Sequence, residues 1–219
     1  MSNQIDLNIV VTSLSGARRA KRKCDAVLTI EDPLYNHGLR FHKKPHPDHL
    51  ILMFEDVDFY QGNIAMPDLK HVEAAIDFGR EHVDHRLLVH CKAGIARSTA
   101  IALAIIADRL GKGHEAEAVK YLLQIRNEAT PNLLLLDMVD DYLNREGRLK
   151  NAWLSVENAH EHYANHRKLK REILEKNPAL YREPFSCLSY SAWRYRPTTL
   201  IREAVIKPDA ASSSQFGLS

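Results

Sequence analysis

The chain has few cysteines, no long apolar segment and little excess charge, and each shortage excludes a class of protein. Its 219 residues contain three cysteines, Cys24, Cys91 and Cys187, and no Cys-x-x-Cys pair. An odd number without metal-ligand spacing argues against a disulfide framework or a zinc site and fits a reducing compartment. The longest apolar runs, such as residues 101–107, fall well short of the roughly 20 residues of a membrane span. The N-terminus lacks the pattern of a signal peptide, so we expect a cytoplasmic protein.

Charge gives little indication of a partner. The formal net charge is +2, with 26% charged and 45% hydrophobic residues, which is typical of a globular protein of one compact domain with an appendage. We therefore expect no nucleic-acid partner. The basic run at residues 18–23 is either a contact for an anionic surface or a solvated helix face, and we favour the second. Four histidines are irregularly spaced in one segment: His37, His42, His46 and His49. They form either a metal site or part of a solvated loop, and we favour the loop.

The most informative segment is residues 90–98, with the sequence HCKAGIARS. The residues before it have the apolar character of a short buried strand, and residues 98–110 have that of an apolar helix. A strand, a tight loop and a helix N-terminus form an anion site, because backbone N–H groups converge there and the helix dipole favours negative charge. The same field favours Cys91 as a thiolate nucleophile. The planar fork of Arg97 suits two phosphate oxygens. The segment therefore predicts a phosphate-binding loop that contains a nucleophile.

This order of residues resembles the H-C-x5-R-S/T loop of the cysteine-dependent protein tyrosine phosphatase superfamily. The likeness covers about residues 5–145 and implies that Cys91 is the nucleophile and Arg97 a phosphate ligand. From its position, Ser98 is expected to donate a hydrogen bond to the cysteine sulfur and to cap the following helix. His90 is expected to support the loop, and the Lys92 side chain either adds charge to the site or points to solvent. The phosphate-binding residues are then Lys92, Ala93, Gly94, Ile95, Ala96 and Arg97. The alternative for Cys91 is a buried structural cysteine.

A general acid must protonate the departing oxygen, because an alkoxide or phenolate leaves poorly. In the resembled superfamily this acid is an aspartate on a loop upstream of the nucleophile. Asp56 lies in a Phe-Glu-Asp context similar to that of phosphatase-and-tensin-type enzymes, whereas Asp58 is followed by Asn63, similar to dual-specificity phosphatases. We favour Asp56 and keep Asp58 as the alternative; the other one is expected to be a solvated carboxylate. Partial burial or a neighbouring carboxylate, such as Glu55, is expected to keep the acid protonated.

The apolar pattern predicts alternating strands and helices, followed by a helical run. This order favours an α/β fold with a short, mostly parallel central sheet flanked by helices and with a helical C-terminal extension. The phosphate loop is expected at the carboxyl end of a strand. The charge-rich end of the segment 151–176 is expected to be a solvated helix. We expect a phosphatase domain at 1–147, a helical and aromatic extension packed on it at 148–209, and a disordered tail at 210–219.

The sequence thus predicts a phosphomonoester hydrolase that acts through a phosphocysteine on phosphotyrosine in a protein or peptide, with phosphoserine and phosphothreonine as further candidates. Its compact length resembles dual-specificity and bacterial-type enzymes. No cofactor or metal is expected, since the nucleophile, acid and anion clamp are all protein groups. A phosphoinositide phosphatase is one alternative, although Ile95 replaces a lysine of the phosphatase-and-tensin-type loop. A catalytically dead phosphate-binding module is the other, against which the retention of Cys91, Arg97 and a candidate acid argues.

Overall fold

A computed structural model describes residues 6–31, 46–58, 65–176 and 193–195, whose strands form one mostly parallel sheet. The spatial order is β1-β4-β2-β3-β5. The four parallel strands are β1 (Ile9–Ser13), β2 (Ala26–Glu31), β3 (His49–Met53) and β4 (Leu87–Cys91). A fifth strand, β5 (Trp193–Tyr195), pairs antiparallel with β3 at the edge. The expected α/β class with a short, mostly parallel sheet is therefore confirmed.

The central strands β2, β3 and β4 are apolar along nearly their whole length, as expected for parallel strands that are covered on both faces. Successive side chains of β2 alternate between two cores. Ala26, Leu28 and Ile30 pack into the larger one, whereas Val27 packs into a smaller one with Ala17. The strand interiors therefore bind the sheet to helices on both sides.

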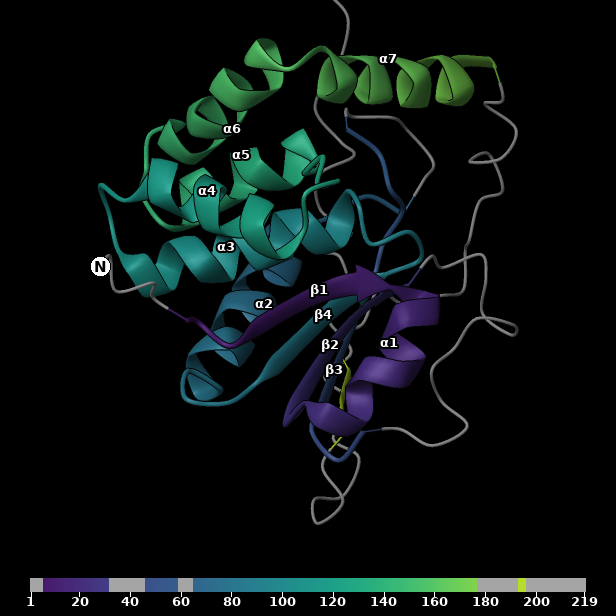
Figure 1. The fold of residues 1–219 in the computed structure, drawn as a ribbon. Coiled ribbons are helices and arrows are strands. Elements are labelled where there is room, and N and C mark those ends of the chain that lie inside the picture. Colours follow the sequence, from purple (N-terminus) through teal and green to yellow (C-terminus); the bar gives the residue numbers. More distant parts are fainter. Residues whose placement is uncertain (1–5, 32–45, 59–64, 177–192, 196–219) are drawn as a thin grey trace, which may run out of the picture.

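Helices cover the two faces unequally (Figure 1). The short helix α1 (Leu14–Ala20), followed by a 3-10 turn at Lys21–Lys23, packs on one face, and the longer helices lie on the other. Among these, α3 is buried over most of its length, which explains why its sequence is apolar all round. The helices of this larger layer are α2 (Leu69–Glu81), α3 (Arg97–Leu110), α4 (Glu115–Ile125), α5 (Leu133–Tyr142) and α6 (Arg148–Ala159).

The segment 151–176, expected to form one helix, belongs to two: α6 is followed by α7 (Glu161–Lys176). His160 has an extended backbone conformation, which ends α6 and changes the direction of the chain (Figure 1). The turn brings the ring of Tyr163 edge-on to that of Trp153, with centroids 5.4 Å apart. Burial of these two aromatic rings thus fixes where α7 begins.

No helix in the described part of the chain is long and apolar enough to cross a bilayer. Residues 177–192 and 196–219 lie outside the described residues, and with them most of the aromatic segment and the whole of the expected tail. The two domain boundaries expected from the sequence therefore stay predictions.

Candidate active site

The common direction of the parallel strands brings two segments that are distant in sequence to one edge of the sheet. β4 ends at Cys91, and the phosphate loop runs from there to the start of α3 at Arg97. β3 ends at Met53, and residues 54–58, here called the acid loop, follow it directly. Because β2 pairs in parallel with both strands, their carboxyl ends lie at the same edge. The nucleophile and the candidate acids are therefore neighbours in space, at the edge where open α/β sheets bind ligands.

Four carbonyl groups of the phosphate loop accept hydrogen bonds from the surrounding scaffold. The Lys92 carbonyl accepts from the amide of Leu14 at 3.1 Å. The Gly94 carbonyl accepts from Arg126 Nε at 2.9 Å. The next two carbonyls accept from the amides of Thr130 and Asn132 at the end of the α4–α5 connection, over 2.9 and 3.3 Å: those of Ile95 and Ala96.

This outward orientation of the carbonyls decides where the amides point. In a planar trans peptide the N–H lies opposite the preceding C=O, so the amides of residues 93, 95, 96 and 97 are directed away from the scaffold. The amide of Gly94 donates to Cys91 Sγ at 3.2 Å, which places the sulfur on this amide-rich side. The loop is therefore a concave set of N–H donors around the cysteine, the arrangement that binds an oxyanion.

Gly94 is required for this conformation. Its φ of +73° is one that side chains disfavour. A Cβ atom there would also lie 2.4 Å from the carbonyl carbon of Thr12 and 2.5 Å from the amide nitrogen of Ser13. Both neighbours are backbone atoms at the end of β1 and cannot give way easily. The glycine thus allows the loop to lie directly against the sheet.

Cys91 is 3% exposed and has two polar contacts at its sulfur. The hydroxyl oxygen of Ser98, in the first turn of α3, lies 3.2 Å from Sγ, at the same distance as the Gly94 amide nitrogen. With the sulfur as a thiolate, both groups donate to it, and the N-terminus of α3 adds its positive dipole end. The contact predicted between Ser98 and the sulfur is present. Capping of α3 by Ser98 is not, because Ala96 is the N-cap and makes no side-chain cap.

Arg97 is 3% exposed and joins the phosphate loop to the acid loop. Its Nη1 donates a 2.7 Å hydrogen bond to the carbonyl of Phe54. The guanidinium group is therefore oriented by the acid loop while it belongs to the helix that carries the phosphate loop. The predicted phosphate ligand is thus hydrogen-bonded to the loop that carries the candidate acids.

His90 is buried beneath the loop and takes part in a chain of side chains across the sheet. Burial lowers the pKa of His90 to about 4, so the ring is neutral near pH 7. Its Nδ1 lies 3.3 Å from the Cys91 carbonyl, which only accepts, so Nδ1 carries the proton. Nε2 then accepts from the Thr29 hydroxyl at 2.8 Å, and Thr29 in turn accepts from His49 Nε2 at 2.7 Å. These contacts are with strands β2 and β3, as a supporting role requires.

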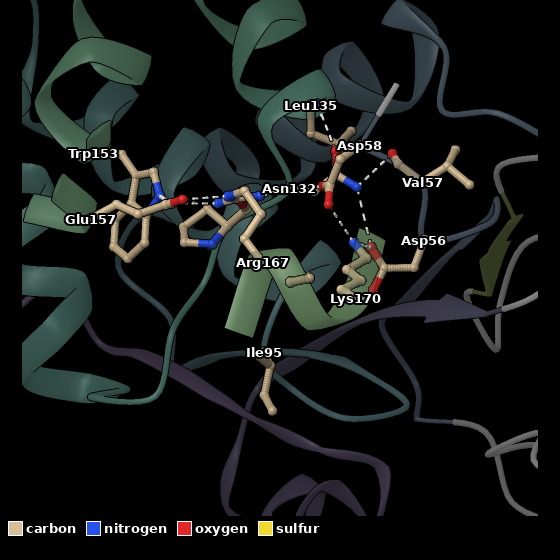
Figure 2. Close-up of polar contacts among 12 residues, drawn as sticks. Asp56, Val57, Asp58, Ile95, Asn132, Leu135, Trp153, Glu157, Arg167 and Lys170 are labelled. Carbon is tan, nitrogen blue, oxygen red and sulfur yellow. Dashed lines mark hydrogen bonds and ion pairs between the residues drawn. The ribbon is translucent and has the colours of Figure 1, made fainter. Parts of the chain in front are cut away.

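Asp56 has a different electrostatic environment from the one expected. One carboxyl oxygen accepts from Lys170 Nζ at 2.7 Å and from Asn132 Nδ2 at 3.2 Å (Figure 2). Burial by itself raises the pKa of Asp56, but the charges of Lys170 and Arg97, together with these hydrogen bonds, outweigh it and lower the pKa. The expectation that burial or a carboxylate neighbour raises the pKa of the acid is therefore wrong for the protein without substrate. The reason is a lysine 114 residues away.

Asp58 lies beside the same lysine. Its Oδ2 is 3.0 Å from Lys170 Nζ, and its Oδ1 is 3.6 Å from Arg167 Nη1. The side chain is 14% exposed, against 29% for that of Asp56. Both aspartates are thus paired rather than solvated, which contradicts the expectation that one of them is a solvated carboxylate.

Three residues of the site were not found from the sequence: Asn132, Arg167 and Lys170. Asn132 is fully buried, caps α5 and donates to the Val57 carbonyl at 2.8 Å. The Thr-Pro-Asn sequence before an apolar helix signals the cap but not the contact with the acid loop. Arg167 and Lys170 lie on α7, whose charge-rich sequence predicted a solvated face. That prediction is wrong for this side of the helix, since the two side chains are 16% and 18% exposed.

The remaining predicted positions are two residues of the phosphate loop and four histidines. Lys92 and Ala93 are exposed. Of the four histidines, His37 and His42 lie outside the described residues. His46 binds the Cys24 carbonyl and Asp48, whereas His49 binds Thr29 on the sheet. The described ranges contain no group of three or more metal-ligating side chains suited to an ion.

The arrangement of strands and helices is similar to that of several solved structures. The crystal structure of PTPMT1 in complex with PI(5)P matches 65% of this chain and 94% of its own, with a TM-score of 0.50 and 19% identity. The chain therefore shares the fold of PTPMT1 over the matched residues. Human tyrosine phosphatase-like serine/threonine/tyrosine-interacting protein and human DUSP28 each match 64% of this chain and 93% of theirs, with TM-scores of 0.49 and 19% identity. No protein-family model matches the chain, and no curated protein is significantly similar in sequence.

Proposed function

We propose that this protein is a phosphomonoester hydrolase that acts through a phosphocysteine at Cys91, with phosphotyrosine in a protein or peptide as its substrate. The observation that carries the proposal is the sulfur of Cys91 with a backbone amide and a hydroxyl each 3.2 Å away, inside an amide-lined loop at a helix N-terminus. The buried Arg97 of the same loop supports it. A structural cysteine needs none of these donors.

The proposed reaction has two displacements at phosphorus. The Cys91 thiolate attacks phosphorus, the S–P bond forms and the bond to the ester oxygen breaks, while Asp56 gives its proton to that oxygen. Water then attacks the phosphocysteine, the S–P bond breaks and inorganic phosphate leaves, with the proton of the water passing to Asp56. The loop amides and Arg97 stabilise the equatorial oxygens in both steps. Ser98 stabilises the thiolate that departs in the second step.

Asp56 must carry a proton in the first step, although its surroundings favour the charged form in the free protein. A bound phosphate dianion would favour the protonated form of Asp56. It places negative charge beside Arg97, which offsets one of the two cations that lower the pKa of Asp56. The acid therefore becomes protonated more readily in the complex than in the free protein.

The proposal is tested by Cys91→Ser in the full chain, with Cys24→Ala as a matched control. Both cysteines are buried, but Cys24 lies on the other side of the sheet, near α1. Cys91→Ser should abolish turnover of p-nitrophenyl phosphate and the burst of phosphoenzyme in rapid quench, because its hydroxyl is a far weaker nucleophile. It should keep tungstate binding by calorimetry, since the amides remain. Cys24→Ala should retain both the turnover and the tungstate binding of the wild-type protein.

A Cys91→Ser protein with a tenth or more of the wild-type rate would rule out the covalent mechanism. Tungstate binding without turnover in the wild-type protein would instead favour a phosphate-binding module. A panel of phosphotyrosyl peptide, phosphothreonyl peptide and phosphoinositide then decides the substrate class. The phosphotyrosyl peptide is expected to have the highest kcat/KM; the phosphoinositide is expected to be poor, because the loop has Ile95 where phosphatase-and-tensin-type enzymes have a second lysine.

A further inference from the structure

The C-terminal helix α7 reaches the acid loop with one face. Tyr163, Arg167 and Lys170 are spaced i, i+4 and i+7, which aligns them along one side of the helix. Arg167 Nη1 and Lys170 Nζ both approach Asp58, and Lys170 alone binds Asp56 as well (Figure 2). The helix thus places two cations on the segment that carries both candidate acids.

This face of α7 is held in place independently of the acid loop. The Tyr163 hydroxyl donates to the Asn127 carbonyl at 2.8 Å, and Arg167 Nη2 donates to the Pro131 carbonyl at 3.0 Å. Arg167 also forms a two-point contact with Glu157 of α6, at 2.6 and 2.7 Å. Glu157 accepts from the buried Trp153 ring N–H at 2.7 Å. The helix is therefore fixed by α6 and by the α4–α5 connection.

The α4–α5 connection also braces the phosphate loop. Its residues Arg126, Thr130 and Asn132 bind three successive carbonyls of that loop, as described above. One face of the connection therefore contacts the phosphate loop, and its carbonyls at Asn127 and Pro131 hold α7. Hydrogen bonds through the α4–α5 connection consequently fix the position of Lys170 relative to the phosphate loop that carries the nucleophile.

The cations of α7 are not arranged as a second anion subsite. Arg167 is occupied by Glu157, and Lys170 lies between two carboxylates at 2.7 and 3.0 Å. A further phosphate or acidic side chain at this place would compete with three carboxylates. The two cations instead neutralise the carboxylates of the acid loop, which indicates that α7 acts by positioning that loop.

We propose that Lys170 is a positioning residue of the active site, which acts through the acid loop: from α7 it holds Asp56 and Asp58 beside the phosphate loop and places proton donation under the control of the C-terminal helix. This inference rests on the proposed function and adds a regulator to it. Movement of α7 would release the acid loop, and its docking fixes the loop.

The contact has a consequence for pH. An ammonium group beside Asp56 favours the carboxylate, so it lowers the pH above which the acid has lost its proton. Loss of Lys170 leaves burial to raise the pKa of Asp56, opposed by Arg97 and the Asn132 amide. The charged and titratable groups around Asp56 are Lys170 and Arg167 from α7, Arg97 from α3, and Glu55 and Asp58 from its own loop.

The test compares Lys170→Met with Lys170→Arg and with Lys168→Met in the full chain. Lys168 is exposed on the same helix and forms no ion pair with any described residue. For phenyl phosphate, a poor leaving group, the alkaline limb of kcat should move up by about 1 pH unit or more in Lys170→Met. Lys170→Arg, which keeps the charge, and Lys168→Met should retain the wild-type limb. In an Asp56→Asn background, Lys170→Met should have no further effect on the limb.

A second readout does not depend on turnover. Carbon-13 NMR of the aspartate carboxyl groups should show Asp56 titrating at higher pH in Lys170→Met, and hydrogen exchange should be faster at residues 54–58. An unchanged titration of Asp56 would overturn the inference, as would a fall in kcat with the limb in place, which indicates a purely structural contact. If the wild-type protein shows no turnover but Asp56 still titrates at higher pH in Lys170→Met, the proposed function would be refuted, whereas the contact of Lys170 with the acid loop would be supported.

Discussion

Asp56 and Asp58 are separated by one residue, yet their partners differ. Asp56 contacts Lys170 and Asn132, and the charge of Arg97 lowers its pKa. Within the described residues, the ion pairs of Asp58 are with Arg167 and Lys170 of α7. Proximity to Arg97 matters because Arg97 is the predicted phosphate ligand. On that ground we keep Asp56 as the proposed acid.

At this scale we expect Asp56→Asn to lower kcat by about 10² to 10⁴ for a phosphotyrosyl peptide, the range of general acid catalysis. The loss should shrink for p-nitrophenyl phosphate, whose leaving group needs less protonation. Steady-state kinetics across pH would measure both, and the alkaline limb should flatten in the variant. Asp58→Asn is the matched control and should be much milder. The opposite ranking would assign the role to Asp58.

At the scale of elements, the α4–α5 connection and the first residue before α5 organise the site. Asn132 accepts from the Leu135 amide at 3.1 Å as the N-cap of α5. Its side-chain amide donates in the other direction, to Asp56 and to the Val57 carbonyl. One side chain thus connects the start of a helix to the acid loop, while its backbone amide braces the phosphate loop.

Two substitutions separate these roles. Asn132→Ala removes the cap and the contacts with the acid loop, so it should cost about 1 kcal/mol of stability, within the 0.5–2 kcal/mol of N-cap losses, and should lower kcat. Asn132→Ser keeps a good N-cap but has no amide to donate, so it should lower kcat with little loss of stability. Urea unfolding and steady-state kinetics provide the two measurements. Equal stability losses in both variants would contradict the capping argument.

At the scale of the whole molecule, two buried neutral histidines make folding depend on pH. Burial lowers the pKa of His71 and of His90 to about 4 from the ordinary value of 6.5. His71 accepts from the Asp68 amide through Nδ1 in the capping box of α2, and protonation removes that acceptor. Between pH 4 and 6.5 the unfolded chain binds more protons at these sites. Stability therefore falls as the pH drops through this window.

His71→Gln tests this dependence because glutamine at the third helical position preserves a capping box without titrating. Between pH 7 and pH 5 the free energy of unfolding of the wild-type protein should decrease more than that of the variant, by about 2 kcal/mol at about 1.4 kcal/mol per pKa unit. Urea titrations at the two pH values would show it. The exposed His166→Gln should keep the wild-type dependence, and an unchanged slope in His71→Gln would refute the buried neutral state.

The sequence determined the parts of this protein that depend on local chemistry. The spacing of Cys91, Gly94 and Arg97 between an apolar strand and an apolar helix is sufficient to predict the phosphate loop, because such a loop needs a positive φ, a helix N-terminus and a fork-shaped cation within a few residues. The alternation of strands and helices similarly predicted the parallel sheet, since its strands are buried on both faces. The two candidate acids were located by the resemblance, which implies an aspartate on a loop upstream of the nucleophile.

Only the tertiary structure decided the electrostatic surroundings of Asp56 and the contacts of α7. Lys170 and Asp56 are 114 residues apart, and no period or motif relates them. Their contact depends on the turn at His160 and on the hydrogen bonds that dock α7 against the α4–α5 connection. The same lysine on a helix in another orientation would be solvated, as its charge-rich sequence suggests. An ion pair between distant elements is fixed by packing, and packing is a property of the whole fold.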